Sequence, residues 1–151
     1  MKYGFSGSRE GMTRDQAEEL VAFLRAQYDD ITEWHDGDCI GADAQAHELV
    51  ETLLGARCRM IGHPPDQSRY RAFLKYNESR LPLPYLVRDR MIVQETEILV
   101  ACPKEMSEVL RSGTWATIRQ GLKTNLVFII LPNGKVKMNK RLAETFDGKA
   151  N

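Results

Sequence analysis

The segment Gly4-Phe5-Ser6-Gly7-Ser8-Arg9 decides the fold of this chain. Residues that favour β-structure lead into two glycines and two serines, and Thr13 then opens a helical pattern. A strand that enters a helix through such a turn leaves N–H groups unpaired beside the positive end of the helix dipole, which favours an anion. The serines would add hydroxyl donors, Gly7 would let a ligand approach closely, and Arg9 would add a charged fork suited to phosphate. The alternative is an ordinary turn in which Arg9 is solvated.

The composition is that of one globular domain. The chain has 151 residues, 42% of them apolar, and its 21 basic and 21 acidic residues give a formal net charge of zero. We expect a single domain over residues 1–138 and a polar tail over 139–151. Neutral charge does not call for a polyanion, so nucleic acid is expected to be an unlikely partner. Without a signal peptide or a long apolar run, the expected location is the cytoplasm, away from membranes.

Strand and helix patterns alternate along the whole chain. Apolar spacing predicts strands over 31–35, 57–62, 97–101 and 126–131, and helices over 14–27, 42–54, 85–94 and 112–123. Residues 66–84 have no clear pattern, and Asn133-Gly134 predicts a hairpin whose second strand is 135–138. The prediction is an α/β fold, with a doubly wound, mainly parallel sheet, helices on both faces and a C-terminal hairpin.

In such a sheet the ligand lies at the carboxyl ends of the strands. Four turns should meet there, at 6–9, 37–43, 62–65 and 111–115. Ser112 to Thr114 forms a second helix start for an anion, two aspartates could accept from ribose hydroxyls, and two arginines could close over phosphates. The expected ligand contacts are Ser6, Gly7, Ser8, Arg9, Gly37, Asp38, Gly41, Ala42, Asp43, His63, Arg88, Arg90, Ser112, Gly113, Thr114 and Trp115.

Several of these residues have a structural alternative. Asp43 could instead compensate the dipole of its helix, His63 could be a turn residue beside two prolines, and Trp115 could be buried rather than stacked on a base. The three cysteines are far apart and odd in number, so we expect reduced, buried thiols. His47 lacks further ligands at a suitable spacing, and we expect neither a metal nor a cofactor.

Together these motifs resemble the SLOG superfamily, and within it the small proteins related to YspA and YpsA. The resemblance rests on Gly-Phe-Ser-Gly-Ser-Arg, Asp-Gly-x-x-x-Gly-Ala-Asp, Arg-Asp-Arg-Met-Ile-Val before Glu-x-Leu-Val-Ala, and Ser-Gly-Thr-Trp, in that order. The superfamily takes in the Rossmann-like domain of DNA-processing protein A and the LONELY GUY (LOG) phosphoribohydrolases. The resemblance implies a Rossmann-like domain that binds nucleotide-derived molecules, ADP-ribose-like signals in several members, and that forms dimers or larger assemblies.

The LOG motif Pro-Gly-Gly-x-Gly-Thr-x-x-Glu is matched only in part. Gly113-Thr114 corresponds to its Gly-Thr and Arg88 to the arginine before it, but Val109-Leu110-Arg111 replaces Pro-Gly-Gly, and Thr117 stands at the catalytic glutamate. Whether the chain is an enzyme stays open, because cleavage of an N-glycosidic bond needs a carboxylate near the oxocarbenium-like transition state. The candidates for catalysis are Asp38, Asp43 and Arg88, and the carboxylate could also come from Asp89 or Glu108.

The leading hypothesis is a module that senses or sequesters a nucleotide-derived metabolite carrying a phosphorylated ribose, such as an ADP-ribose-like or NAD-like molecule. The alternatives are a phosphoribohydrolase or other N-glycosidase acting on a nucleoside monophosphate, and a protein that binds single-stranded DNA.

Overall fold

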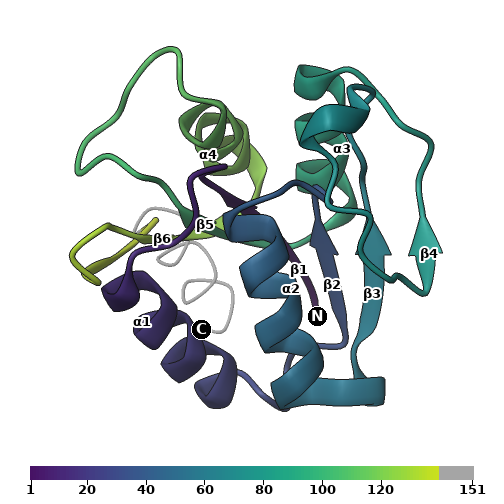
Figure 1. Ribbon diagram of the computed structural model, residues 1–151. Coiled ribbons are helices and arrows are strands. Elements are labelled where there is room, and N and C mark those ends of the chain that lie inside the picture. The colour runs from purple at the N-terminus through teal and green to yellow at the C-terminus, as the bar shows by residue number, and fades with distance from the viewer. Residues whose placement is uncertain (140–151) are drawn as a thin grey trace.

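The computed structural model describes residues 1–139, and within this part of the chain all seven strands join one sheet (Figure 1). The strand order is β4-β3-β2-β1-β5-β6-β7, and every neighbouring pair is parallel except β6 with β7. The strands are β1 (Lys2–Gly7), β2 (Glu33–Asp36), β3 (Arg59–Gly62), β4 (Glu78–Ser79), β5 (Ile98–Cys102), β6 (Leu126–Ile130) and β7 (Val136–Met138). The predicted doubly wound sheet with a C-terminal hairpin is confirmed.

Helices cover both faces of the sheet, also as predicted (Figure 1). The helices are α1 (Arg14–Ala26), α2 (Ala42–Leu54), α3 (Tyr85–Glu95) and α4 (Gly113–Thr124), with short 3-10 turns η1 (Gly55–Arg57) and η2 (Ser68–Tyr70). Successive side chains of a strand point to opposite faces. Val100 of β5 therefore packs in the core beside α1 and α2, whereas Leu99 packs with Ile118 of α4.

The helix starts follow from local capping. The Thr13 hydroxyl accepts from the Gln16 backbone amide, and the Gln16 side-chain oxygen accepts from the Thr13 amide. These two hydrogen bonds fix the start of α1. Ser112 caps α4 by accepting from the Trp115 amide. The hairpin turn uses Gly134, whose φ of 86° lies in the left-handed region that glycine adopts readily.

The boundaries differ from the prediction at two strands and in one unassigned segment. β2 begins at Glu33, two residues late, and β3 begins at Arg59 because residues 55–57 form η1. The segment 66–84 contributes the edge strand β4, which is too short and polar to show a strand pattern. The predicted polar tail lies outside the described residues from position 140 onward.

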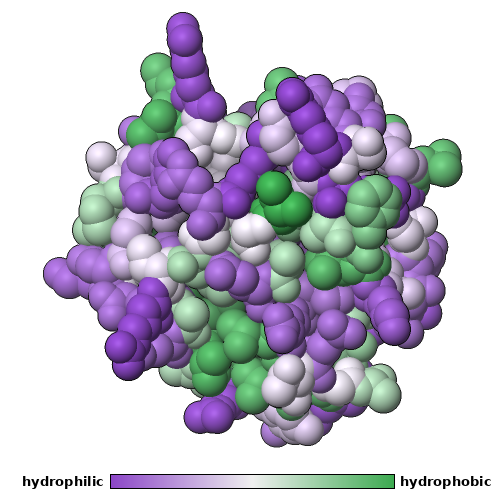
Figure 2. All heavy atoms as spheres, viewed as in Figure 1, coloured by the Kyte–Doolittle hydropathy of each residue, from purple (hydrophilic) through white to green (hydrophobic). Residues whose placement is uncertain are grey.

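The molecular surface in Figure 2, seen from the same side as Figure 1, is mostly hydrophilic, with apolar residues in small groups between the polar ones. None of the helices between residues 1 and 139 has the length and apolar character needed to cross a bilayer.

Candidate functional site

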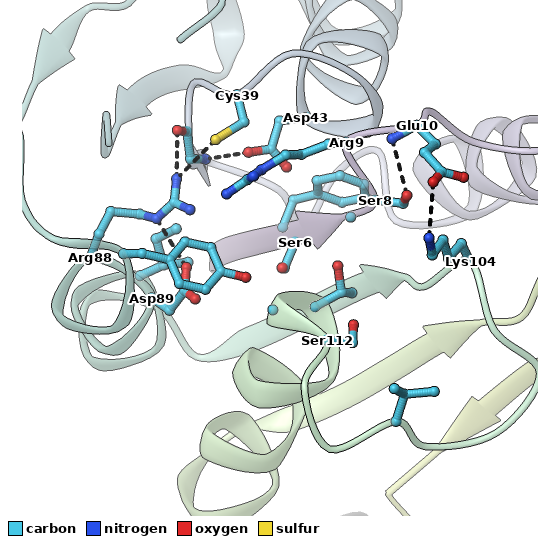
Figure 3. Close-up of a pocket in the computed structure, with 18 of the residues that line it drawn as sticks. Ser6, Ser8, Arg9, Glu10, Cys39, Asp43, Arg88, Asp89, Lys104 and Ser112 are labelled. Carbon is cyan, nitrogen blue, oxygen red and sulfur yellow. Dashed lines mark hydrogen bonds and ion pairs between the residues drawn. The ribbon is translucent and has the colours of Figure 1, made fainter. Parts of the chain in front are cut away.

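A cavity of about 520 Å³ opens where β1 and β5 end (Figure 3). These neighbouring strands lead to helices on opposite faces of the sheet, since β1 is followed by α1 and β5 by α4. This is the topological switch point of a doubly wound sheet. The loop after β1 and the loop after β5 form two walls, and α3 forms a third. Ser8 and Gly113, far apart in sequence, therefore line the same cavity.

The first turn of α4 presents open donors to this cavity. The cavity is lined by Ser112, Gly113 and Thr114. The Ser112 hydroxyl accepts a hydrogen bond from the amide of Trp115, the third residue of the helix. The amides of Gly113 and Thr114 remain without an intrahelical acceptor, because a helix cannot satisfy its first N–H groups. The first turn carries no acidic residue that would compete for them. The predicted helix start thus faces the cavity, with the positive end of its dipole.

The loop after β1 is not a helix start, which corrects the prediction made for Ser6 to Arg9. α1 begins only at Arg14, after an intervening loop. The Ser8 amide extends the ladder of β1 with β5 by donating to the Cys102 carbonyl (3.2 Å), and the Ser8 hydroxyl accepts from the Glu10 amide (3.1 Å). The Ser8 amide and hydroxyl, which the sequence suggested for a phosphate, are therefore engaged within the protein. Residues 6–9 nevertheless line the cavity.

Cationic side chains line the cavity from two loops. Arg9, Lys104 and Arg111 line it from the two loops, and Lys104 pairs with Glu10 at 2.9 Å across the rim (Figure 3). The Arg9 guanidinium lies over the Tyr70 ring, 3.7 Å from its centroid, which holds this arginine by a cation–π contact. Lys104 was not among the predicted contacts.

Arg88 lines the cavity but does not reach out to close over it, contrary to the prediction. Its side chain is buried, and Nη1 donates to the Gly37 carbonyl (2.7 Å) and to the Cys39 sulfur (3.4 Å). Its Nε lies 3.0 Å from Asp89 Oδ1 in an ion pair. Burial lowers the pKa of Arg88, but Asp89, Cys39 and Asp43 together raise it by more, so the pKa is raised and this guanidinium stays charged. Through its contacts with Gly37 and Cys39, Arg88 holds the turn after β2 in place.

The Asp38 carboxylate is also bound by groups of the protein itself. It is fully buried, pairs with Arg71 Nε at 2.7 Å and accepts from the Leu74 amide at 2.9 Å. It does not line the cavity, which corrects its expected role on a ribose and as a catalytic candidate. Gly41 is likewise structural: its φ is 91°, and a Cβ there would strike the backbone of Ser8 and Arg9.

Asp43 does line the cavity and has a perturbed acidity. Its Oδ2 accepts from the Gly37 amide at 3.1 Å. Burial, and then the nearby charge of Asp36, raise the pKa of Asp43 to about 8. Near neutral pH this carboxyl is therefore largely protonated and can donate as well as accept a hydrogen bond.

Four further predicted contacts do not line the cavity. His63 is buried against His35, with Nε2 2.8 Å from His35 Nδ1, and Trp115 is buried and donates to Glu105 (3.0 Å). Ala42 is covered by core residues, and Arg90 is exposed on the outer side of α3. Local sequence could not show these orientations, since each depends on packing between distant segments. Asp89, named from the sequence only as a possible carboxylate, lines the cavity, and the lining residues that the sequence reasoning missed are Phe5, Glu10, Cys39, Tyr85, Ile92, Lys104, Glu105, Val109 and Arg111.

Thr117, at the position of the LOG glutamate, is fully buried, and its hydroxyl donates to the Gly113 carbonyl at 3.1 Å. It supplies no carboxylate to the cavity. The acidic side chains that line the cavity come from other segments, namely Glu10, Asp43, Asp89 and Glu105.

One group of described residues has the composition of a metal site. Donor atoms of His35, His63 and Glu95 lie within 4.8 Å of one another. The two imidazole nitrogens are only 2.8 Å apart, which is a hydrogen-bond distance, whereas two nitrogens on one tetrahedral zinc are separated by about 3.3 Å. We therefore read this group as a hydrogen-bonded pair of histidines.

Comparison with known proteins gives a fold but no close relative. No family model and no curated protein matches the sequence. Three solved structures, each with a TM-score of 0.59, resemble the chain. TM1055 is 15% identical (82% of this chain, 69% of that one), DNA processing protein A from Helicobacter pylori 14% (97% and 73%), and DprA from Streptococcus pneumoniae 16% (85% and 49%).

These matches bear on two predictions. The Rossmann-like fold that the resemblance implied is confirmed, since the solved structures of DNA-processing protein A share the fold of this chain. The expectation that nucleic acid is an unlikely partner is wrong, because the Helicobacter pylori protein is described by its single-stranded DNA binding mode. Net charge misled here, since phosphate contacts depend on a few local cations and not on the sum over the chain. Self-association stays a prediction. The chain thus has the Rossmann-like fold found in DNA-processing protein A.

Proposed function

We propose that this protein binds a phosphorylated, nucleotide-derived small molecule in the cavity between β1 and β5, and that it senses or sequesters that molecule. The single observation behind the proposal is the first turn of α4, whose residues Gly113 and Thr114 line a cavity that Arg9, Lys104 and Arg111 also line. Backbone donors at a helix start together with cationic side chains are the donor set that phosphate prefers in proteins.

The rest of the cavity suits the remainder of such a ligand. Its volume of about 520 Å³ falls in the range of small-molecule sites. The cavity is also lined by the apolar side chains of Phe5 and Ile92, by Tyr85, whose hydroxyl lies against Gly113, and by the carboxyl groups of Asp43 and Asp89. Apolar groups can pack against a sugar or base, and carboxyl groups can accept from hydroxyls.

The test is calorimetric titration with AMP, ADP-ribose and NAD, with adenosine as the control that lacks a phosphate. We expect at least one phosphorylated compound to bind in the micromolar range and adenosine to bind at least tenfold more weakly. Arg9→Ala should lower the affinity for the phosphorylated ligand about tenfold and should change the thermal unfolding midpoint little. Equal binding of adenosine and AMP, or no binding of any compound at millimolar concentration, would contradict the proposal. Chromatography of the same mixtures for free base tests the hydrolase alternative.

A second candidate is single-stranded DNA, supported by a group of arginines and aromatic rings beside the cavity. Tyr70 lies between Arg9 (3.7 Å) and Arg69 (4.6 Å), and Arg71 lies 4.7 Å from the largely exposed Phe73 ring. Flat aromatic and guanidinium groups of this kind stack on unpaired bases while their charges meet the backbone. The likeness in fold to DNA-processing protein A adds to this support.

Fluorescence anisotropy with a labelled single-stranded oligonucleotide tests this candidate. Binding should weaken steeply as salt rises, and Phe73→Ala should reduce the affinity about fivefold or more. Phe73 lies outside the cavity, so the same variant should leave AMP binding unchanged. Binding that is insensitive to both salt and Phe73→Ala would count against the stacking surface.

A further inference from the structure

The acidic residues that line the cavity differ in how far the protein already uses them. Glu10 pairs with Lys104, and Glu105 accepts from the Trp115 indole at 3.0 Å. Asp43 accepts from the Gly37 amide. Among these four lining residues Asp89 is the exception: its Oδ1 pairs with Arg88 Nε at 3.0 Å, and its Oδ2 has no hydrogen-bond partner.

This unpartnered oxygen is deeply buried. Asp89 is 4% exposed and lies on α3, next to the cavity and packed toward α4. An acceptor that folding removes from water without a partner destabilises the protein by about 1–3 kcal/mol. Such groups in native proteins usually meet a donor from a ligand or an ordered water. Burial raises the pKa of this carboxyl above its ordinary value, and the Arg88 guanidinium and the Thr117 hydroxyl offset only part of that rise.

We propose that Asp89 accepts hydrogen bonds from the sugar hydroxyls of the ligand, so that the cavity selects a ribose 5-phosphate over its 2-deoxy counterpart. The inference rests on the proposed function, because it places the phosphate at the first turn of α4. Asp89 and that turn line the same cavity from two adjacent helices. A cation is a poor alternative, since Arg88 already neutralises the carboxylate. Neutral hydroxyl donors suit it better.

This assignment moves sugar recognition away from the turn after β2, where the sequence suggested it. Asp38 is occupied by Arg71 and the Leu74 amide, and Asp43 is held by Gly37. The carboxylate left over stands on α3, beside the residue Thr117 of α4 that replaces the glutamate of the LOG motif in sequence. The acidic group of the cavity thus comes from a different helix.

The experiment compares ribose 5-phosphate with 2-deoxyribose 5-phosphate by calorimetry, and includes inorganic phosphate as the probe for the anion site alone. Loss of one hydrogen bond to a charged acceptor should weaken binding about tenfold to hundredfold for the deoxy sugar. Asp89→Asn should bring the two affinities within about threefold, because the amide oxygen would face Arg88 and leave a donor where the free acceptor was. Ile118→Val, a buried change on the facing helix at a residue that does not line the cavity, should keep the discrimination.

The outcomes separate the two proposals. Equal affinity of the two sugars for the wild-type protein would overturn the role of Asp89 while leaving phosphate binding intact, and this comparison needs no variant. Discrimination that survives in a folded Asp89→Asn protein would also overturn it. Failure of all three probes to bind would remove the proposed function and the inference with it.

Discussion

The turn after β2 and the first turn of α4 lie at the same edge of the sheet, yet they use their polar groups in opposite ways. After β2, Asp36 accepts from the Asp38 amide, from the Tyr76 hydroxyl and from His47 (2.9 Å), and Asp38 is paired with Arg71. At α4 the capping hydroxyl satisfies one amide and leaves the two before it open to the cavity. The carboxylates of the turn after β2 thus have partners within the protein, whereas the first two amides of α4 have no partner within the helix.

The difference shows that a glycine-bearing turn with aspartates is not in itself a ligand site. Both turns have the sequence signals of one, and only the satisfaction of their hydrogen bonds separates them. We therefore expect changes in the turn after β2 to act on stability, and changes at α4 to act on binding. The predictions below test this division, from the largest expected effect to the smallest.

Asp36→Ala should have the largest effect, and on stability. It removes one carboxylate that serves His47, Tyr76 and a backbone amide, all in the interior. The free energy of unfolding, measured by urea denaturation, should fall by about 3–5 kcal/mol, because partners are left buried and unpaired. The matched control is Asp29→Ala. The Asp29 side chain is 97% exposed, so this substitution should change the free energy of unfolding by less than about 0.5 kcal/mol. A loss below about 1 kcal/mol at Asp36 would show that this region is not a closed network.

Thr114→Asp should act on binding in place of stability. A carboxylate in the first turn of α4 favours the helix dipole but repels an incoming phosphate. AMP affinity should fall by about thirtyfold or more in calorimetry, while unfolding free energy changes by less than about 1 kcal/mol. Thr114→Ser keeps the backbone and the hydroxyl and serves as the control. Position 113 is less suitable, because any Cβ there would overlap the Tyr85 hydroxyl. Unchanged affinity in Thr114→Asp would place the phosphate elsewhere.

Asp43→Asn should alter the pH dependence of stability. The folded pKa of about 8 lies above the ordinary value of 3.8, so the folded state binds one more proton than the unfolded state between about pH 4 and 8. The contribution of Asp43 is complete below pH 4 and is lost as pH rises to about 8. The asparagine variant does not lose stability in this way, so its unfolding free energy relative to wild type should rise from pH 4 to pH 8, by up to about 1.4 kcal/mol for each pH unit. Parallel stability curves for the two proteins would contradict the assignment.

Lys104→Ala should have the smallest effect. Its partner Glu10 is 71% exposed, and such pairs contribute little to stability. We expect an unfolding free energy within about 0.5 kcal/mol of wild type and a loss of AMP affinity of about threefold that shrinks in high salt. A stability loss above 1 kcal/mol would mean that the rim is also structural.

The sequence was sufficient for the fold because its signals are local. Thr13 and Gln16 form a capping box, Asn133-Gly134 forms a turn, and the apolar run before Cys102 is long enough to mark a central strand. The segment 66–84 escaped prediction because its strand, β4, has two polar residues and is held by pairing with β3.

The site was less predictable because it depends on partners distant in sequence. Nothing near Asp38 indicates that Arg71 will pair with it, and nothing near Arg88 indicates that the Gly37 carbonyl, 51 positions away, will occupy it. Asp89 was one of several carboxylates that the sequence left open, and its oxygen without a hydrogen-bond partner is evident only in the folded structure, where α3 packs beside α4.

The most direct test of an open α4 beside a closed turn after β2 is a titration followed by ¹H–¹⁵N NMR. AMP is added to labelled protein while the backbone amides of Gly113 and Thr114 are compared with those of Gly37 and Asp38. The account predicts large downfield shifts at 113 and 114, as expected for amides that donate to phosphate, and small shifts at 37 and 38. Large shifts at 37 and 38 with unmoved signals at 113 and 114 would contradict it.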